Sequence, residues 1–294
     1  MPRTLKAGTL IENENTLYER FVIQEDSLLI SKTERDNYRK KKEAERFNLY
    51  VRQNAKEHGG FTFVNTLCDL TVNDPATVGR LAYLSTYLDF NNQALLIGQN
   101  YPMRKSDLSH ILQITKPTAA KFYGDAVASG LMIDHGAEGL YLDKVFFRGS
   151  TNKSDTQTRL YIGTVRNLYN RLKASQHHRF GYVVQLIPFI NREWNILCHN
   201  PCEVESQSIN PMSIKQLCQK LHLNAEHSTR LSKAITTPVF SFDGQEQQLC
   251  AIVPTNTNYG KQSTVYVNPH LIYGGSDFSK VEGIGVAFSA RVKG

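Results

Sequence analysis

The sequence lacks the features of several large protein classes. No apolar run approaches the roughly 20 residues of a membrane-spanning helix, and the chain does not open with an export signal. Its five cysteines are odd in number and irregularly spaced, which favours reduced thiols over a disulfide framework. These absences predict a soluble, cytoplasmic protein with no membrane partner.

Motifs of common catalytic classes are missing as well. The sequence has no Walker-type phosphate loop and no compact acidic group typical of a metal nuclease. Cys198 and Cys202 flank His199, yet no second pair of zinc ligands follows at a matching distance. His227 and Arg230 have the His-x-x-Arg spacing of tyrosine recombinases, but two residues match such a spacing by chance. We therefore expect a non-enzymatic protein with no cofactor and no metal.

What the chain does contain is a degenerate internal repeat. The order of elements is kept in three pairs of segments, although identities are few and the second copy carries insertions. The paired segments are residues 79–88 with 181–190, 102–112 with 211–221, and 140–150 with 265–276. A length of 294 residues suits two domains of this kind.

Each copy contains the pattern of a helix, a tight turn and a second helix. In the first copy, residues 108–112 predict a short amphipathic helix, and Thr115 and Pro117 suit the cap and first turn of the next. Residues 131–142 then predict two strands around a glycine-rich turn. In the second copy, Asn224 caps residues 225–235, followed by strands at 249–253 and 264–267.

A polar helix is expected near the N-terminus. Ser31 and Glu34 have capping-box spacing, and neither proline nor glycine interrupts the chain until Gly59. Apolar residues are sparse over residues 31–56, which is typical of a lever or an oligomerisation arm. A homodimer formed through this helix is therefore one hypothesis, and contact of the helix with DNA is another.

The closing strands resemble a known module. Val267 to Gly275, with Asn268-Pro269 inside, is similar to the end of the winged-helix module in plasmid and phage replication initiators of Gram-positive hosts. Two winged helices in one chain are also the layout of several plasmid initiators. The resemblance implies an α+β fold, a tandem repeat of two winged helix-turn-helix domains preceded by an N-terminal helical arm.

The expected boundaries follow the repeat. They are residues 1–60 for the N-terminal segment, 61–150 for the first winged helix, 151–179 for a basic linker with the leading strand and helix of the second copy, and 180–294 for the second winged helix.

The charge distribution favours a polyanionic partner. The net charge is +7. The segment from Arg148 to Arg179 contains seven lysines and arginines and a single acidic residue, Asp155. We expect a sequence-specific double-stranded DNA-binding protein that reads two half-sites about one helical turn apart. Replication initiation at a plasmid or phage origin is the leading use. Transcriptional regulation, or a protein-interaction module that binds a host polymerase or replication factor, remains open.

The candidate DNA-binding residues carry cationic, hydroxyl, imidazole or phenol side chains on or near the expected recognition helices and their flanks. They are Arg104, Lys105, Ser106, Lys116, Thr118, Lys121 and Tyr123 in the first copy, Arg166 and Lys173 between the copies, and Lys215, His227, Thr229, Arg230, Lys233 and Lys261 in the second. Arg230 is the strongest candidate for base discrimination, because a bidentate contact to guanine is worth about 1–3 kcal/mol.

Overall fold

The structure is a computed structural model of the chain, and it describes residues 33–42, 45, 49, 59–71, 73–90, 93–98, 100–149, 156–257, 260–275 and 277–288. The chain divides into two compact units, Met1–Gln53 and Asn54–Gly294. In the smaller unit, residues 33–42 are helical and Arg39 pairs with Asp36 at 3.4 Å. Most of the helix predicted over residues 31–56 lies outside the described residues.

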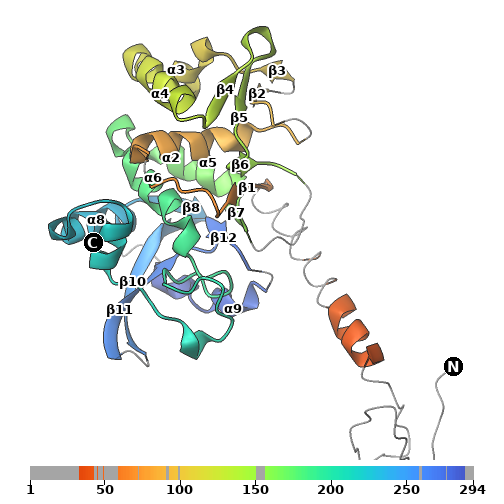
Figure 1. Ribbon diagram of the computed structural model, residues 1–294, viewed down its shortest axis with the longest axis vertical. Coiled ribbons are helices and arrows are strands. Elements are labelled where there is room, and N and C mark those ends of the chain that lie inside the picture. Colours follow the sequence, from red (N-terminus) through yellow and green to blue (C-terminus); the bar gives the residue numbers. More distant parts are fainter. Residues whose placement is uncertain are drawn as a thin grey trace, which may run out of the picture. The chain divides into compact units, whose positions relative to one another are not determined.

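The larger unit combines helices with small antiparallel sheets in two successive halves (Figure 1). The first half contains β1 Phe61–Asn65, α2 Pro75–Leu84, β2 Leu96–Ile97, β3 Tyr101–Pro102, α3 Leu108–Ile111, α4 Lys116–Ala128, β4 Met132–Asp134, β5 Leu140–Leu142 and β6 Phe146–Phe147. The second half contains β7 Gln157–Tyr161, α5 Ile162–Arg171, α6 His177–Gln185, α7 Ile214–Lys220, α8 Ser228–Thr236, β8 Val239–Phe242, β9 Gln245–Gln248, β10 Cys250–Thr257, β11 Gly260–Val267, β12 Ile272–Tyr273 and α9 Ser279–Glu282. No helix among the described residues is both long and apolar enough to span a bilayer.

Local sequence explains where the main helices begin. The Asp74 carboxylate accepts the Thr77 backbone N–H at 2.9 Å, and Pro75 occupies the first turn of α2. Thr115 caps α4 in the same manner. Ser213 begins α7 as part of a capping box. The helix start predicted at Thr115 is therefore confirmed.

The two halves repeat the same backbone hydrogen bonds. Helices α2 and α6 occupy equivalent places in the two halves. The extended segment after each of them bonds on one side to a hairpin strand, β5 or β11, and on the other side to the methionine before α3 or α7. The equivalent bonds are Met103 N–H to Leu95 O at 2.8 Å with Met212 N–H to Leu197 O at 2.9 Å, and Leu95 N–H to Leu140 O at 2.8 Å with Leu197 N–H to Val265 O at 2.9 Å. The two halves therefore share these two pairs of equivalent backbone hydrogen bonds.

A four-stranded antiparallel sheet joins the halves in the order β12-β7-β1-β6. The leading strands of the two halves pair at its centre, with Phe61 opposite Tyr161 and Asn65 opposite Gln157. Each leading strand is flanked by a strand of its own half, β6 or β12. The sheet is therefore close to symmetric about the β1–β7 pair.

Helices α2 and α6 cross at the two glycines that the repeat pairs. A Cβ atom on Gly181 would overlap the carbonyl oxygen of Pro75, and one on Gly79 would lie 2.6 Å from the carbonyl oxygen of His177. Only glycine permits so close an approach of two helix backbones. Together with one apolar core that runs through both halves, this crossing makes the halves a single packed body.

The second half contains a hairpin that the repeat does not predict. Strands β8 and β9 turn at Asp243 and Gly244, whose φ angles of 49° and 71° are typical of a tight hairpin turn. The hairpin packs on α5 through the Ser241 N–H, which donates to Asn167 Oδ1 at 2.7 Å. The helix predicted at residues 225–235 is also divided into a 3-10 turn, Ala225–His227, and α8.

Candidate nucleic-acid interface

Helix α4 has a buried face and a solvent face. Ala119, Phe122 and Ala126 are buried in the core, whereas Lys116 and Lys121 are exposed. Thr118 is half-buried, and its hydroxyl lies 2.9 Å from that of Thr115, the cap residue of the helix. The structure therefore leaves the two lysines of α4 available to a partner.

Two other candidates of the first half contact each other and an acid. Lys105 Nζ lies 4.2 Å from the ring centroid of Tyr123, whose hydroxyl donates to Asp134 Oδ2 at 2.7 Å. Hydrogen bonds from Tyr123 and the Gly136 N–H, together with nearby positive charges, lower the pKa of Asp134. Tyr123 and Lys105 thus lie beside a carboxylate that the sequence analysis did not identify.

The segment before α3 is exposed but also carries an acid. Arg104, Lys105 and Ser106 are exposed, and Asp107 Oδ2 accepts the Arg104 N–H at 2.8 Å. The Asp107 carboxylate therefore occupies the backbone donor at the start of this segment. The side chains of Arg104 and Ser106 are what this segment offers to a phosphate.

The solvent-exposed face of α8 is more polar than that of α4. His227, Thr229, Arg230 and Lys233 are all exposed, while the opposite face is buried. Among the candidate cations whose side chains the structure describes, none forms an ion pair with another described residue. Burial, together with the positive charges of Arg179 and Arg230, lowers the pKa of His178 on α6. Figure 1 places α4 and α8 toward the same side of the larger unit.

The remaining candidates lie on elements other than α4 and α8. Lys215 is exposed on α7, and Lys173 is exposed between α5 and α6. Lys261 lies on β11, opposite Asn256 of β10, and its side chain is outside the described residues.

Arg166 is half-buried and its guanidinium is engaged within the protein. Its guanidinium donates to the hydroxyl and carbonyl oxygens of Thr86, at 3.0 and 2.8 Å, and lies 4.4 Å from the ring centroid of Tyr87. Because Arg166 belongs to α5 and Thr86 follows α2, the contact joins the two halves. Arg166 is therefore a structural cation in this conformation.

The same holds for much of the basic segment from Arg148 to Arg179. From residue 157 onward it forms β7, α5 and the start of α6. Its other engaged arginines are Arg148, which donates to Leu88 O at 3.1 Å, Arg159, which donates to Gly275 O at 2.6 Å, and Arg171, which pairs with Glu246 at 2.7 Å. The segment therefore offers fewer cations to a partner than its composition suggests.

A buried aromatic and cationic cluster lies at the junction. Arg80 Nε donates to His177 Nδ1 at 3.4 Å, and the Tyr169 hydroxyl lies 3.1 Å from both this nitrogen and the Leu112 carbonyl oxygen. Tyr83 stacks on Tyr169 with ring centroids 3.8 Å apart. Burial and the positive charge of Arg80 lower the pKa of His177 to about 4. The α3–α4 turn thus contacts α5 of the other half directly.

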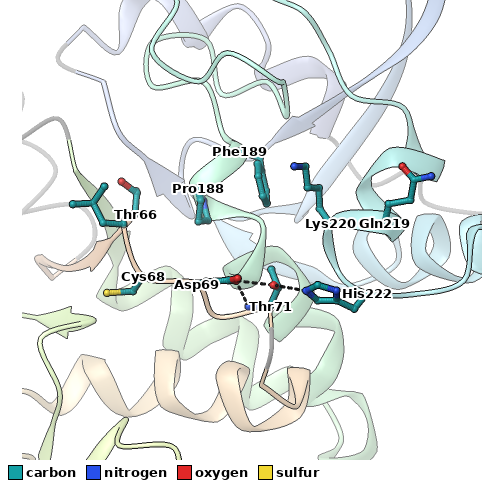
Figure 2. Close-up of a pocket in the computed structure, with 10 residues that line it drawn as sticks. Thr66, Cys68, Asp69, Thr71, Pro188, Phe189, Gln219, Lys220 and His222 are labelled. Carbon is teal, nitrogen blue, oxygen red and sulfur yellow. Dashed lines mark hydrogen bonds between the residues drawn. The ribbon is translucent and has the colours of Figure 1, made fainter.

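A cleft of about 400 Å³ opens between the halves (Figure 2). Its lining residues are Thr66, Leu67, Cys68, Asp69, Thr71, Pro188, Phe189, Gln219, Lys220 and His222. The Thr71 hydroxyl donates to Asp69 Oδ1 at 2.6 Å and lies 3.2 Å from His222 Nε2. Lys220 Nζ lies 5.0 Å from the ring centroid of Phe189. The cleft is therefore crossed by a hydrogen bond between the first and second halves.

The described part of the chain contains no group of three or more His, Cys, Asp or Glu residues placed to hold a metal ion. Cys198 is buried and Cys202 is exposed. Burial raises the pKa of the Cys198 thiol to about 12, so this thiol is not readily ionised.

Comparison of the chain with protein-family models, curated proteins and solved structures gave no match.

Proposed function

We propose that the larger unit is a tandem of two winged helix-turn-helix domains that binds double-stranded DNA in a sequence-specific manner and without catalysis. The observation that carries this proposal is the equivalence of Lys121 and Arg230. Both side chains are exposed cations at the same position of the repeat, one on α4 and the other on α8. In helix-turn-helix proteins the second helix of the pair enters the major groove.

The elements after each second helix support the same proposal. Hairpin β4–β5 follows α4, and the longer hairpin β10–β11 follows α8 after the inserted β8–β9 hairpin. A hairpin in this position is the wing of a winged helix. Lys261 on β11 would then approach the phosphate backbone beside the groove.

Binding would combine two kinds of contact. Lys116 and Lys121, with Arg104 and Ser106 before α3, supply phosphate contacts in the first half. Arg230 can hold guanine O6 and N7 in a bidentate contact, with Thr229 and Lys233 beside it. Because α2 and α6 pack closely and join the two halves, α4 and α8 would approach DNA as parts of one body.

Selection from a random duplex library tests this function. An enriched motif whose affinity falls steeply with salt is expected. The double variant Lys121→Ala with Arg230→Ala should lose specific binding while retaining its thermal unfolding transition. Lys280→Ala, which removes a cation paired with Glu193 in the C-terminal part, is the matched control and should bind as the wild type does. A folded double variant with unchanged affinity would contradict the assignment.

The biological use we propose is initiation of replication at a plasmid or phage origin, on the strength of the resemblance of residues 267–275. Regulation of transcription needs the same DNA contacts. The location of the selected motif, in an origin or in a promoter, distinguishes the two uses.

One observation favours a second function for the first half. Beside its lysines, α4 exposes Ala120, Gly124 and Val127, a mainly apolar surface for a helix that enters DNA. Such a surface suits contact with a protein, such as a host polymerase or replication factor. If Lys121→Ala leaves DNA binding unchanged while Arg230→Ala abolishes it, this second function gains support.

A further inference from the structure

Two equivalent turn residues have an unusual backbone conformation. Gln113, between α3 and α4, has a φ of 52°, and His222, between α7 and α8, has a φ of 54°. Both follow the last leucine of the paired segments, Leu112 and Leu221. Their N–H groups make matching bonds, to His110 O at 3.2 Å and to Gln219 O at 3.1 Å. The two turns are therefore the same structure formed twice.

The left-handed region is uncommon for residues other than glycine. Glycine would occupy both positions without a steric cost. The turn itself therefore does not require glutamine or histidine at these positions, and their long polar side chains are available for contacts outside the turn.

Each of the two side chains reaches the opposite half of the molecule. Gln113 Nε2 donates to Asn170 Oδ1 on α5 at 3.0 Å. His222 Nε2 lies 3.2 Å from the hydroxyl of Thr71, before α2, and that hydroxyl donates to Asp69 (Figure 2). The Thr71 oxygen therefore accepts from the imidazole N–H. The first half contacts the second, and the second contacts the first, through equivalent residues.

Both contacts lie close to the start of a candidate recognition helix. Gln113 is two residues before Thr115, the cap of α4, and His222 is two residues before Asn224, the cap of the turn that leads into α8. The α2–α6 crossing holds the two halves of the larger unit together. The contacts of Gln113 and His222 join the residues that lead into each second helix to the opposite half.

We propose that Gln113 and His222 are reciprocal positioning residues that set the distance between α4 and α8, and through it the spacing of the two DNA half-sites. The inference rests on the proposed function, because it concerns the spacing between the two half-sites of the DNA that this function requires. It assigns spacing selectivity to two side chains that do not contact DNA.

The test is a spacing series. The two parts of the motif selected by the full-length protein are separated by additional or fewer base pairs, and affinity is measured for each duplex. The test variant carries two substitutions. Asn170→Ala, at an exposed position of α5, removes the oxygen that accepts from Gln113. His222→Asn removes the imidazole that contacts Thr71. Asparagine tolerates positive φ but is too short to reach Thr71. Gln176→Ala, which removes an amide contact within one half, is the control.

We expect the wild type and the control to favour one spacing sharply. In the double variant, discrimination against one added base pair should fall about fivefold, the effect of one to two weak hydrogen bonds, with little change at the best spacing. An unchanged spacing profile in the folded double variant would overturn the inference, as would equal losses at every spacing. A selected motif with a single half-site would overturn it and leave the proposed function standing. A wild type that selects no motif would remove both.

Discussion

The two halves of the larger unit share a common frame, which consists of equivalent backbone hydrogen bonds and the α2–α6 crossing. Their solvent-exposed faces differ. The same backbone bonds hold Met103 and Met212 in place. On the first half, however, Tyr123 contacts both Lys105 and Asp134, whereas Thr229, Arg230 and Lys233 of the second half are exposed to solvent.

This difference indicates that the frame and the surface of the repeat are under separate physical constraints. Close packing limits what α2 and α6 can contain, because backbone atoms of one helix lie against the other. No such packing limits the outward faces of α4 and α8. A DNA site read by this body would therefore be asymmetric, with α8 supplying most of the base discrimination.

The largest effect should come from breaking the shared frame. Gly181→Ala places a methyl group on the Pro75 carbonyl, so the helices must separate, and we expect a loss of more than about 3 kcal/mol in the free energy of unfolding. Urea unfolding measures the loss. Gly124→Ala on α4 is the matched control, because a Cβ there meets nothing within 4 Å, and it should stabilise by about 0.5–1 kcal/mol. Equal stability of the two variants would show that the crossing is looser than described.

Acid should weaken the same junction. His177 has a pKa of about 4 in the folded protein and an ordinary value of 6.5 when unfolded. Between these values the unfolded chain binds more protons, so stability is retained above pH 6.5 and falls as the pH is lowered toward 4. The loss from this group is at most about 1.4 kcal/mol per pH unit.

Urea unfolding at several pH values, with the wild type and His177→Gln compared, isolates this histidine because all other groups titrate in both proteins. The variant should show a shallower decline between pH 6.5 and 4. Parallel curves for the two proteins would mean that His177 is not buried in its neutral form.

The two surfaces can be compared by single substitutions. Arg230→Ala should cost about 1–3 kcal/mol of binding free energy and relax the preference for one base. Lys121→Ala should weaken binding to all sequences alike and reduce the salt slope by about one. Equilibrium binding to the selected motif and to single-base variants at several salt concentrations checks both expectations. If the two substitutions behave alike, the halves do not differ in role.

Local patterns in the sequence account for part of this organisation. The caps at Asp74 and Thr115, and the paired glycines of α2 and α6, follow from residue type and spacing. The engagement of Arg166 could not be predicted, because its partner Thr86 is 80 residues away and no local pattern specifies that contact. The repeat does not predict the β8–β9 hairpin because the first half has no equivalent, although Asp243-Gly244 is an ordinary hairpin signal.

The smallest expected effect concerns Asp134, whose carboxylate would lie near the phosphates if α4 enters DNA. Asp134→Asn removes this negative charge and keeps a side-chain oxygen that can accept from Tyr123. Affinity for the selected motif should rise about twofold at low salt, the size of one exposed charge interaction, and the gain should shrink as salt is added. Glu246→Gln, on the β8–β9 hairpin of the second half, is the matched control and should give no gain. A gain from the control but not from Asp134→Asn would place the DNA nearer to that hairpin than to α4, and would remove the first half from the interface.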